Sequence, residues 1–135
     1  MNDSYMQLIV EATRLSVPKK LSEDANAGFC GSALLAANGK VYTGISLSGK
    51  VGIQFCGEVG AVMSMLSNGE TRIKAVAAVS NDHKLMPPCG RCREMIYQVN
   101  KQNLDTKFML ENDRTVTLEE LLPDRWEDLW AQPES

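Results

Sequence analysis

Three cysteines and one glutamate carry the most specific chemistry in this chain: Cys56, Glu58, Cys89 and Cys92. Thiolates are zinc ligands, and three protein ligands leave the fourth position of a tetrahedral ion open to water, as in catalytic rather than structural zinc sites. The ion lowers the pKa of that water toward about 7, and a nearby carboxylate can accept its proton and deliver it to a leaving group. The residues therefore predict hydrolysis by a zinc-activated water, with Glu58 as the acid/base group. Such a site suits an amino-substituted heteroaromatic ring at neutral pH.

Both ligand clusters fall where helices are expected to begin, over about residues 56–66 and 89–100. Cys89 and Cys92 occupy positions i and i+3, so their Cβ atoms should lie about 5–6 Å apart on one helical face. Side chains of a first turn tilt toward the N-terminus, which lets Glu58 and the preceding thiol reach one group beyond the helix end. The positive ends of two helix dipoles also favour the net negative charge of three thiolates around one Zn²⁺.

Helices and strands are interleaved along the rest of the chain. Asn38-Gly39 predicts a tight hairpin with positive φ at both turn positions, and Thr117 with Glu120 has capping-box spacing. Strands interleaved with helices favour a sheet covered on both faces. We therefore expect a single α/β domain over residues 1–135, a three-layer αβα sandwich around a mixed five-stranded sheet. Besides the two helices above, the expected elements are helices over residues 5–17 and after Thr117, and strands over residues 29–37, 41–47, 73–80, 107–110 and 114–117.

Size and composition fit one globular domain. The chain has 135 residues, of which 44% are hydrophobic and 23% charged, with a formal net charge of -3. Lysines and arginines are scattered, which argues against a nucleic-acid partner. No secretion signal is apparent at the start, and the longest uninterrupted apolar run, residues 33–37, is too short to cross a membrane. We therefore expect a cytoplasmic protein with reduced cysteines and no membrane partner.

Two other interpretations of the cysteines remain open on spacing. Cys89-Gly-Arg-Cys92 by itself is compatible with a thiol redox module. A non-catalytic, zinc-stabilised binding domain would need a fourth ligand, for which Cys30 and His83 are the remaining candidates. We expect Cys30 to be a small buried apolar residue and His83 a solvated loop residue. The Cys-x-Glu sequence at a second helix start favours the catalytic interpretation over both.

The two motifs, Cys56-Gly57-Glu58 and Pro88-Cys89-Gly90-Arg91-Cys92-Arg93, together resemble the zinc signature of the cytidine deaminase superfamily, in the variant with cysteine as first ligand. The likeness covers most of the chain. Residues 31–35 and 39–44 resemble the hairpin before the site, and Leu121-Leu122-Pro123 followed by Trp126 resembles the C-terminal segment. The sequence is most similar to the blasticidin-S-deaminase-like branch of the small, usually tetrameric enzymes.

The resemblance implies a zinc hydrolase of the cytidine deaminase-like fold, with zinc on Cys56, Cys89 and Cys92. Glu58 would be the proton shuttle while zinc-bound hydroxide attacks a cytosine-type aminopyrimidine, free or as a small nucleoside such as cytidine, deoxycytidine or a blasticidin-S-like compound. Ammonia would be released. The backbone N–H of Gly57 would hydrogen-bond the ring, and the protein would be a homotetramer.

Four further residues are candidates for substrate contact. Where nucleoside deaminases carry an Asn and a Glu that hold the ribose, this chain has Ser46 and Ser48, which either touch substrate or end a strand. The exact substrate is left open, because a site built for sugar hydroxyls depends on such partners. Phe29 is one position from the family's base-stacking Phe and is either a ring-stacking wall or a core aromatic. Trp126 either lids a pocket, its own or a neighbour's, or packs in a helix.

Overall fold

The centre of the molecule is a long strand, β2 (Asn26–Ala36), in a computed structural model that describes residues 2–130. It pairs antiparallel with β3 (Val41–Ser48) on one side and with β5 (Ile73–Ser80) on the other. Strand β5 is a nearly continuous apolar run, as expected of a strand that is covered on both faces.

The sheet continues to both sides of these three strands in the order β4-β3-β2-β5-β6-β7, with β1 paired to β2. Strand β6 (Lys107–Leu110) runs parallel to β5, and β7 (Arg114–Thr117) runs antiparallel to β6. The α/β fold with a mixed sheet is confirmed, but the expected count of five strands is wrong, because residues 2–130 form a sheet of seven. The additional strands, β1 (Lys19–Lys20) and β4 (Gln54–Phe55), have two residues each, too few to give a periodic pattern.

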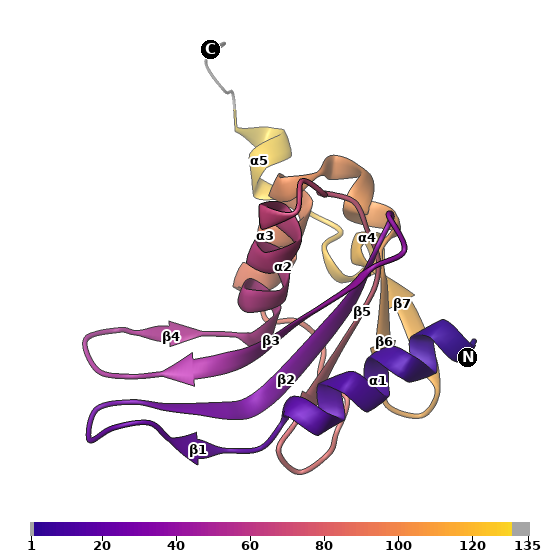
Figure 1. Cartoon of the computed structure of the whole chain (residues 1–135). Helices are drawn as coiled ribbons and strands as arrows, with labels where there is room; N and C mark the ends of the chain where they lie inside the picture. Colours follow the sequence, from indigo (N-terminus) through magenta and orange to yellow (C-terminus); the bar gives the residue numbers. More distant parts are fainter. Residues whose placement is uncertain (1, 131–135) are drawn as a thin grey trace.

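Helices cover both faces of the sheet (Figure 1). Helix α1 (Asp3–Leu15) lies on one face, while α2 (Gly57–Ser67) and α3 (Gly90–Val99) lie on the other. Successive strand residues point to opposite faces, so Ala33 belongs to the apolar cluster under α1 and Leu34 to the cluster under α2 and α3. A 3₁₀ helix, η1 (Lys101–Asp105), precedes β6, and two short helices, α4 (Leu118–Leu121) and α5 (Trp126–Leu129), follow β7.

Local hydrogen bonds set the ends of these elements. Helix α1 starts two residues earlier than expected, because the Asn2 side chain accepts a hydrogen bond from the Tyr5 N–H at 2.9 Å and caps it. The capping box between Thr117 and Glu120 is confirmed. The expected bounds of the strands over residues 73–80, 107–110 and 114–117 are confirmed, and most of the other boundaries differ from the expected ones by one to a few residues.

The hairpin between β2 and β3 is confirmed, but its turn is not of the expected type. Positive φ occurs at Gly39 alone, at 85°, rather than at both turn positions. The Gly39 N–H donates to the Ala36 carbonyl at 3.0 Å, and Asn38 Oδ1 accepts from the Lys40 N–H at 2.9 Å. This is the three-residue loop in which glycine takes the left-handed position.

The start of α2 is pressed onto the backbone of β3. A Cβ atom at Gly44 would lie 2.3 Å from the Gly57 carbonyl oxygen and 2.6 Å from the Ala61 nitrogen. Both contacts are shorter than atoms can approach, so only glycine permits this packing. The close approach fixes the first turn of α2, with Cys56 at its N-cap, against the centre of the sheet.

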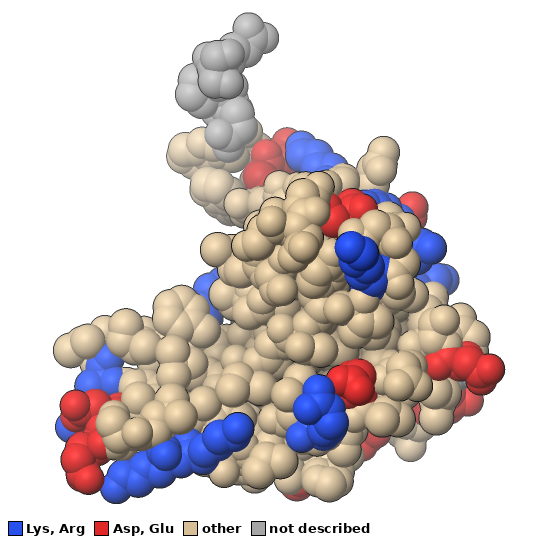
Figure 2. Space-filling model, in the orientation of Figure 1, with Lys and Arg blue, Asp and Glu red and all other residues tan. Residues whose placement is uncertain are grey.

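Charged side chains are spread over the face shown in Figure 2, where basic and acidic groups alternate with large uncharged areas. Several are paired, as in the contact of Lys50 with Asp24 at 2.8 Å. Within residues 2–130, no helix combines the length and the apolar character needed to cross a lipid bilayer.

Candidate metal centre and adjoining cavity

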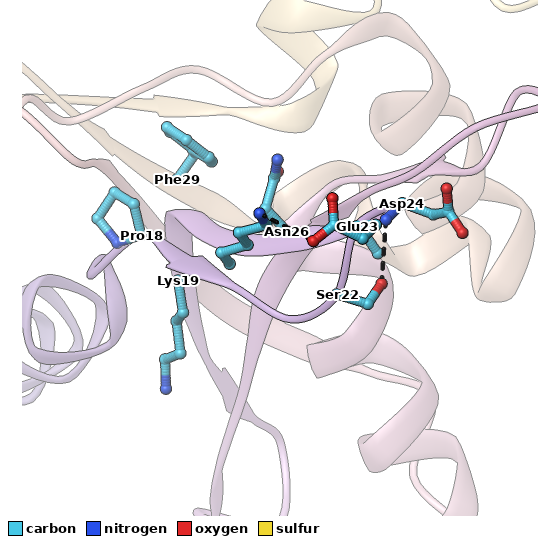
Figure 3. Close-up of a pocket in the computed structure, with 9 residues that line it drawn as sticks. Pro18, Lys19, Ser22, Glu23, Asp24, Asn26 and Phe29 are labelled. Atoms are coloured by element: carbon cyan, nitrogen blue, oxygen red, sulfur yellow. Dashed lines mark hydrogen bonds and ion pairs between the residues drawn. The ribbon is translucent and has the colours of Figure 1, made fainter.

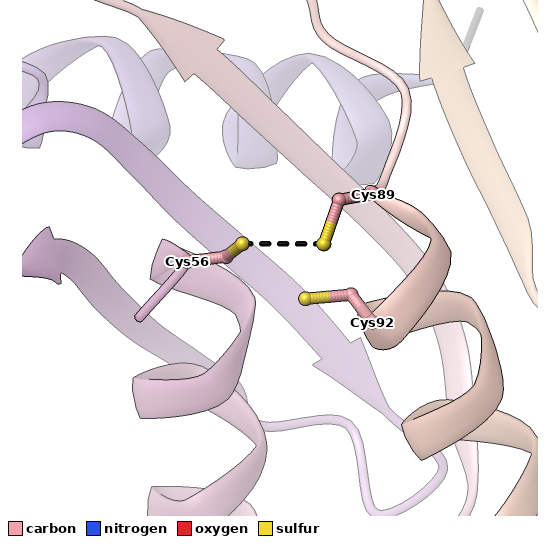
Figure 4. Close-up of side chains that lie close together, drawn as sticks. All are labelled: Cys56, Cys89 and Cys92. Atoms are coloured by element: carbon pink, nitrogen blue, oxygen red, sulfur yellow. Dashed lines mark hydrogen bonds between the residues drawn. The ribbon is translucent and has the colours of Figure 1, made fainter. Parts of the chain in front are cut away.

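Three cysteines meet where the two helices on one face of the sheet begin. Cys56 is the N-cap of α2, Cys89 is the N-cap of α3, and Cys92 lies in the first turn of α3. Their sulfur atoms lie within 4.8 Å of one another, and the sulfurs of Cys56 and Cys89 are 3.3 Å apart (Figure 4). Zinc–sulfur bonds of about 2.3 Å at tetrahedral angles place sulfurs roughly 3.8 Å apart, so the spacing suits one shared ion.

The charges around the sulfurs also suit a cation. Burial, followed by the negative charges of Glu58 and Cys56, raises the pKa of the Cys92 thiol far above its ordinary value. Burial and the adjacent Cys89 thiol likewise raise the pKa of Cys56. Burial acts in the same direction on Cys89, but the Cys92 backbone N–H and the neighbouring thiols outweigh it and lower the pKa of Cys89. Two of the three thiols therefore resist ionisation, and a positive ion between them would relieve that resistance.

Glu58 lies in the first turn of α2 and is 4% exposed. One of its oxygens, Oε1, accepts a hydrogen bond from Ser32 Oγ at 2.8 Å. Ser32 belongs to β2 and is fully buried. Ser32 was not among the site residues predicted from the sequence, although a serine inside an otherwise apolar strand is a signal that could have identified it.

A cavity of about 260 Å³ opens beside Glu58 and two of the cysteines. Among its described lining residues, Glu58 is the only acidic side chain, and there is no basic one. The lining includes Phe29, Ser46 and Ser48, three of the expected substrate contacts; Gly57 is buried in the first turn of α2 and is not part of it. The full lining consists of Phe29, Cys30, Ser46, Ser48, Gln54, Phe55, Cys56, Glu58, Ala78, Ser80, Met86, Pro87 and Cys89.

Two residues at the edge of this cavity, Phe29 and Cys30, do not pack in the core, a position that the sequence allowed for the first and predicted for the second. Phe29 is 48% exposed, so it is not a core aromatic. Cys30 is half-buried and lines the cavity, so it is not a core residue either, because β2 brings it to the same end of the sheet as the site. Its backbone N–H donates to Ser46 Oγ at 3.0 Å. Burial, together with the charges of Glu58 and Cys56, raises the pKa of the Cys30 thiol to about 11.

Trp126 lies away from the cavity. Its ring stacks on that of Trp130 with centroids 4.8 Å apart, and 59% of the residue is exposed. Trp126 is therefore not among the described residues that line the cavity, and its stacking on Trp130 matches the packing alternative; a role at a neighbour's pocket stays a prediction. His83 is exposed, in the turn that follows β5, with a φ of 66°.

A second hollow, of about 320 Å³, also borders Phe29 (Figure 3). Its described lining consists of the segment around β1, with Lys19, Lys20, Glu23 and Asp24 among its members. These charged residues are exposed, and the hollow contains neither a thiol nor a buried acid. It is larger than the cavity beside the cysteines, but it lacks groups that could activate water.

Phe55 and Met86 were missed by the sequence analysis, although both line the cavity beside the cysteines. Phe55 belongs to the two-residue strand β4, which pairs with the end of β3. The Arg91 guanidinium lies 5.6 Å from the centre of the Phe55 ring and donates to the Gln54 carbonyl at 2.9 Å. Helix α3 thus fixes this edge of the cavity through a contact that no local sequence pattern predicts.

Comparison with curated proteins finds clear relatives, although no family model matches the chain. The chain is 33% identical over 98 residues to the cytidine deaminase of Halalkalibacterium halodurans, covering 69% of this chain and 73% of that protein. It is 32% identical over 95 residues to the cytidine deaminase of Mycobacterium tuberculosis, covering 70% and 69%. It is also 29% identical over 115 residues to the blasticidin-S deaminase of Bacillus cereus, covering 76% and 79%.

Solved structures agree with these relatives. The crystal structure of cytidine deaminase from Mycobacterium tuberculosis superposes with a TM-score of 0.76 at 26% identity, covering 93% of this chain and 98% of that one. The enzyme from Burkholderia pseudomallei gives a TM-score of 0.70 at 27% identity, covering 93% and 100%. In sequence and in fold, the chain belongs to the cytidine deaminase family of zinc-dependent hydrolases.

Proposed function

We propose that this protein hydrolyses the exocyclic amino group of a cytosine-type aminopyrimidine, free or as a small nucleoside, and releases ammonia. The observation that carries the proposal is a buried carboxylate, Glu58, at the wall of a cavity and beside three sulfurs that face one another, two of which also line that cavity. Cys56, Cys89 and Cys92 would hold a zinc ion, which supplies when bound the Lewis acidity that activates a water molecule.

Glu58 is proposed as the acid/base group. Among the described lining residues of the cavity it is the only acidic side chain. At 4% exposure it has little contact with bulk water. In this role it takes a proton from the attacking water and gives it to the ring nitrogen, then takes a second proton from the hydroxyl group added to the ring and gives it to the leaving amine. One carboxyl group can do both, because the acid formed in the first transfer is the donor for the second.

The other lining residues suit an uncharged heteroaromatic ring. Phe29 exposes its ring at the cavity, where it can stack on an aromatic substrate. Gly57 begins α2, so its backbone N–H belongs to the first turn, which has no intrahelical acceptors, and we propose that it donates to the ring. Ser46 Oγ already accepts from Cys30 N–H, which leaves its own proton to donate, and Ser48 adds a second hydroxyl.

Ammonia release tests the proposal. The purified protein, with zinc content measured, should release ammonia from at least one of cytidine, deoxycytidine, cytosine and blasticidin S, with a parallel change in ring absorbance. Glu58→Gln should keep the zinc and lose at least about 100-fold in kcat, because general acid–base catalysis contributes that much or more. Absence of turnover on the whole panel by fully zinc-loaded protein would overturn the proposed reaction.

The same preparation separates the two alternative functions. A redox module would form a fast, reversible Cys89–Cys92 disulfide and would hold no stoichiometric metal. That alternative gives no role to Cys56, whose sulfur is 3.3 Å from that of Cys89. A non-catalytic zinc domain would keep its function in Glu58→Gln, whereas the proposed enzyme would not.

We further propose a homotetramer in the cytoplasm. Large apolar side chains are exposed outside the cavity, including Met63 on α2 at 57% and Trp126 at 59%, and a second copy of the chain could cover them. All four cysteines are free thiols, which suits a reduced compartment. Light scattering on the eluting protein should give four times the 14.9 kDa mass of one chain.

A further inference from the structure

We propose that Ser32 is a positioning residue that holds the Glu58 carboxylate in its working orientation. The inference rests on the proposed role of Glu58 in catalysis and adds a residue from another element to that role. Its basis is the hydrogen bond from Ser32 Oγ to Glu58 Oε1 at 2.8 Å, which joins the central strand β2 to the first turn of α2.

Burial makes this contact costly to lose for both partners. Ser32 is 0% exposed and Glu58 is 4% exposed. Within residues 2–130, neither side chain makes any other hydrogen bond. A buried hydroxyl or carboxylate without a partner is unfavourable by several times the net value of an ordinary hydrogen bond. The two groups therefore satisfy each other, and the orientation of each depends on the other.

The support for Ser32 is rigid. Its Cα pairs with Gly44 on β3 and with Ala78 on β5, so hydrogen-bonded strands flank it on both sides. A Cβ atom at Gly57 would lie 2.8 Å from Ser32 Oγ, which shows how closely the start of α2 fits over this hydroxyl. Catalytic groups need to be held within about 0.5 Å of their productive positions by such neighbours.

The chemistry of serine suits a partner that changes its protonation state. A hydroxyl donates to a carboxylate and can also accept from a carboxylic acid, so the contact can persist when Glu58 gains a proton. With Oε1 held by Ser32, the second oxygen, Oε2, is left to exchange protons with water and substrate. Alanine at position 32 would leave both oxygens without this restraint.

Steady-state kinetics test the positioning role. We expect Ser32→Ala to lower kcat about 10- to 100-fold, as is typical when a supporting partner of a catalytic group is removed, with KM and zinc content unchanged. Ser16→Ala is the matched control, because Ser16 is also buried but its hydroxyl donates to the Thr13 carbonyl at the C-terminal end of α1. A kcat within twofold of the wild type, or a rise in KM alone, would overturn the proposal.

A second measurement does not depend on turnover. In the zinc-loaded protein, a double-mutant cycle of Ser32→Ala and Glu58→Ala should show coupled thermal stabilities, with the double variant departing from the sum of the single Tm shifts by roughly 3 °C or more. Additive shifts would contradict the inference. If wild-type protein deaminates nothing, the proposed function fails, yet the cycle still decides whether Ser32 and Glu58 act together.

Discussion

The floor and the rim of the cavity are built in different ways. The floor consists of Cys56, Glu58 and Cys89, together with the buried Cys92 beside them, and these residues lie at the starts of two helices packed on the centre of the sheet. The rim consists of Phe29, the ends of β3 and β4, and Met86, and its side chains range from half-buried to partly exposed. The floor can therefore hold atoms at fixed separations, whereas the rim is held by individual contacts, such as those of Arg91 with Gln54 and Phe55.

We infer from this difference that the floor determines the reaction and the rim determines the substrate. Helix starts and close backbone packing fix the sulfurs within 4.8 Å of one another, which the metal requires. We expect the rim to contact the part of the substrate that extends beyond the reacting ring, and to vary without disturbing the metal. We therefore expect substitutions in the floor to abolish turnover and substitutions in the rim to change which substrate is turned over.

The largest effect should come from Cys92→Ala. Removing one of three sulfur ligands should abolish stoichiometric zinc and lower activity by at least about 1,000-fold, because two ligands do not hold the ion in place. Zinc measured after gel filtration checks the prediction. Cys30→Ala is the control, because Cys30 lines the same cavity but lies outside the three-sulfur group. Zinc loss in both variants would contradict the division between floor and rim.

Gly44→Ala should be the next most damaging change. The new methyl group would lie 2.3 Å from the Gly57 carbonyl oxygen, so the start of α2 would have to move away from β3. We expect a loss of about 1–3 kcal/mol in the free energy of unfolding and weaker zinc retention. Urea denaturation and zinc competition measure the two effects. Gly90→Ala, with no atom within 4 Å of its new Cβ, should be tolerated.

Phe29→Ala tests the role of the rim in substrate binding. Loss of a stacking ring should raise KM about 5- to 100-fold, because base–aromatic stacking is worth about 1–3 kcal/mol, while zinc content should stay the same. Stability should change little, because the residue is 48% exposed. Val41→Ala, an exposed apolar residue outside the described lining, serves as the control. An unchanged KM would remove Phe29 from the substrate site.

The same division explains how much the sequence could predict. The three cysteines and Glu58 are read directly, because metal ligands at helix starts have a short, fixed spacing. The αβα layers also follow from the order of apolar segments. Phe55 and Met86 could not be found this way, because they reach the cavity through a two-residue strand and a loop that only the assembled sheet brings together.

The turn between β2 and β3 is a smaller case in which the sequence-based prediction failed for the same reason. Asn38-Gly39 predicted positive φ at both residues, yet only Gly39 has it, whereas Asn112 and Asp113 adopt φ of 63° and 56°. The hydrogen bonds around Asn38 favour a three-residue loop, and they depend on the register of β2 against β3. Dipeptide preference alone therefore locates a hairpin without fixing its geometry.

The smallest effects are expected at the two rim serines. Neither Ser46 nor Ser48 carries a charge, and a neutral hydrogen bond contributes about 0.5–1.5 kcal/mol, so Ser46→Ala or Ser48→Ala should lower kcat/KM roughly 2- to 10-fold. Ser67→Ala, at an exposed serine that donates to the Met63 carbonyl on α2, should leave kcat/KM unchanged.

If a sugar hydroxyl bonds Ser46 and Ser48, the loss should appear with cytidine and disappear with free cytosine. Equal losses on both compounds would mean that the serines shape the cavity rather than recognise the sugar. A loss of 1,000-fold or more would show that the rim is as demanding as the floor, and the division between reaction and substrate would not hold.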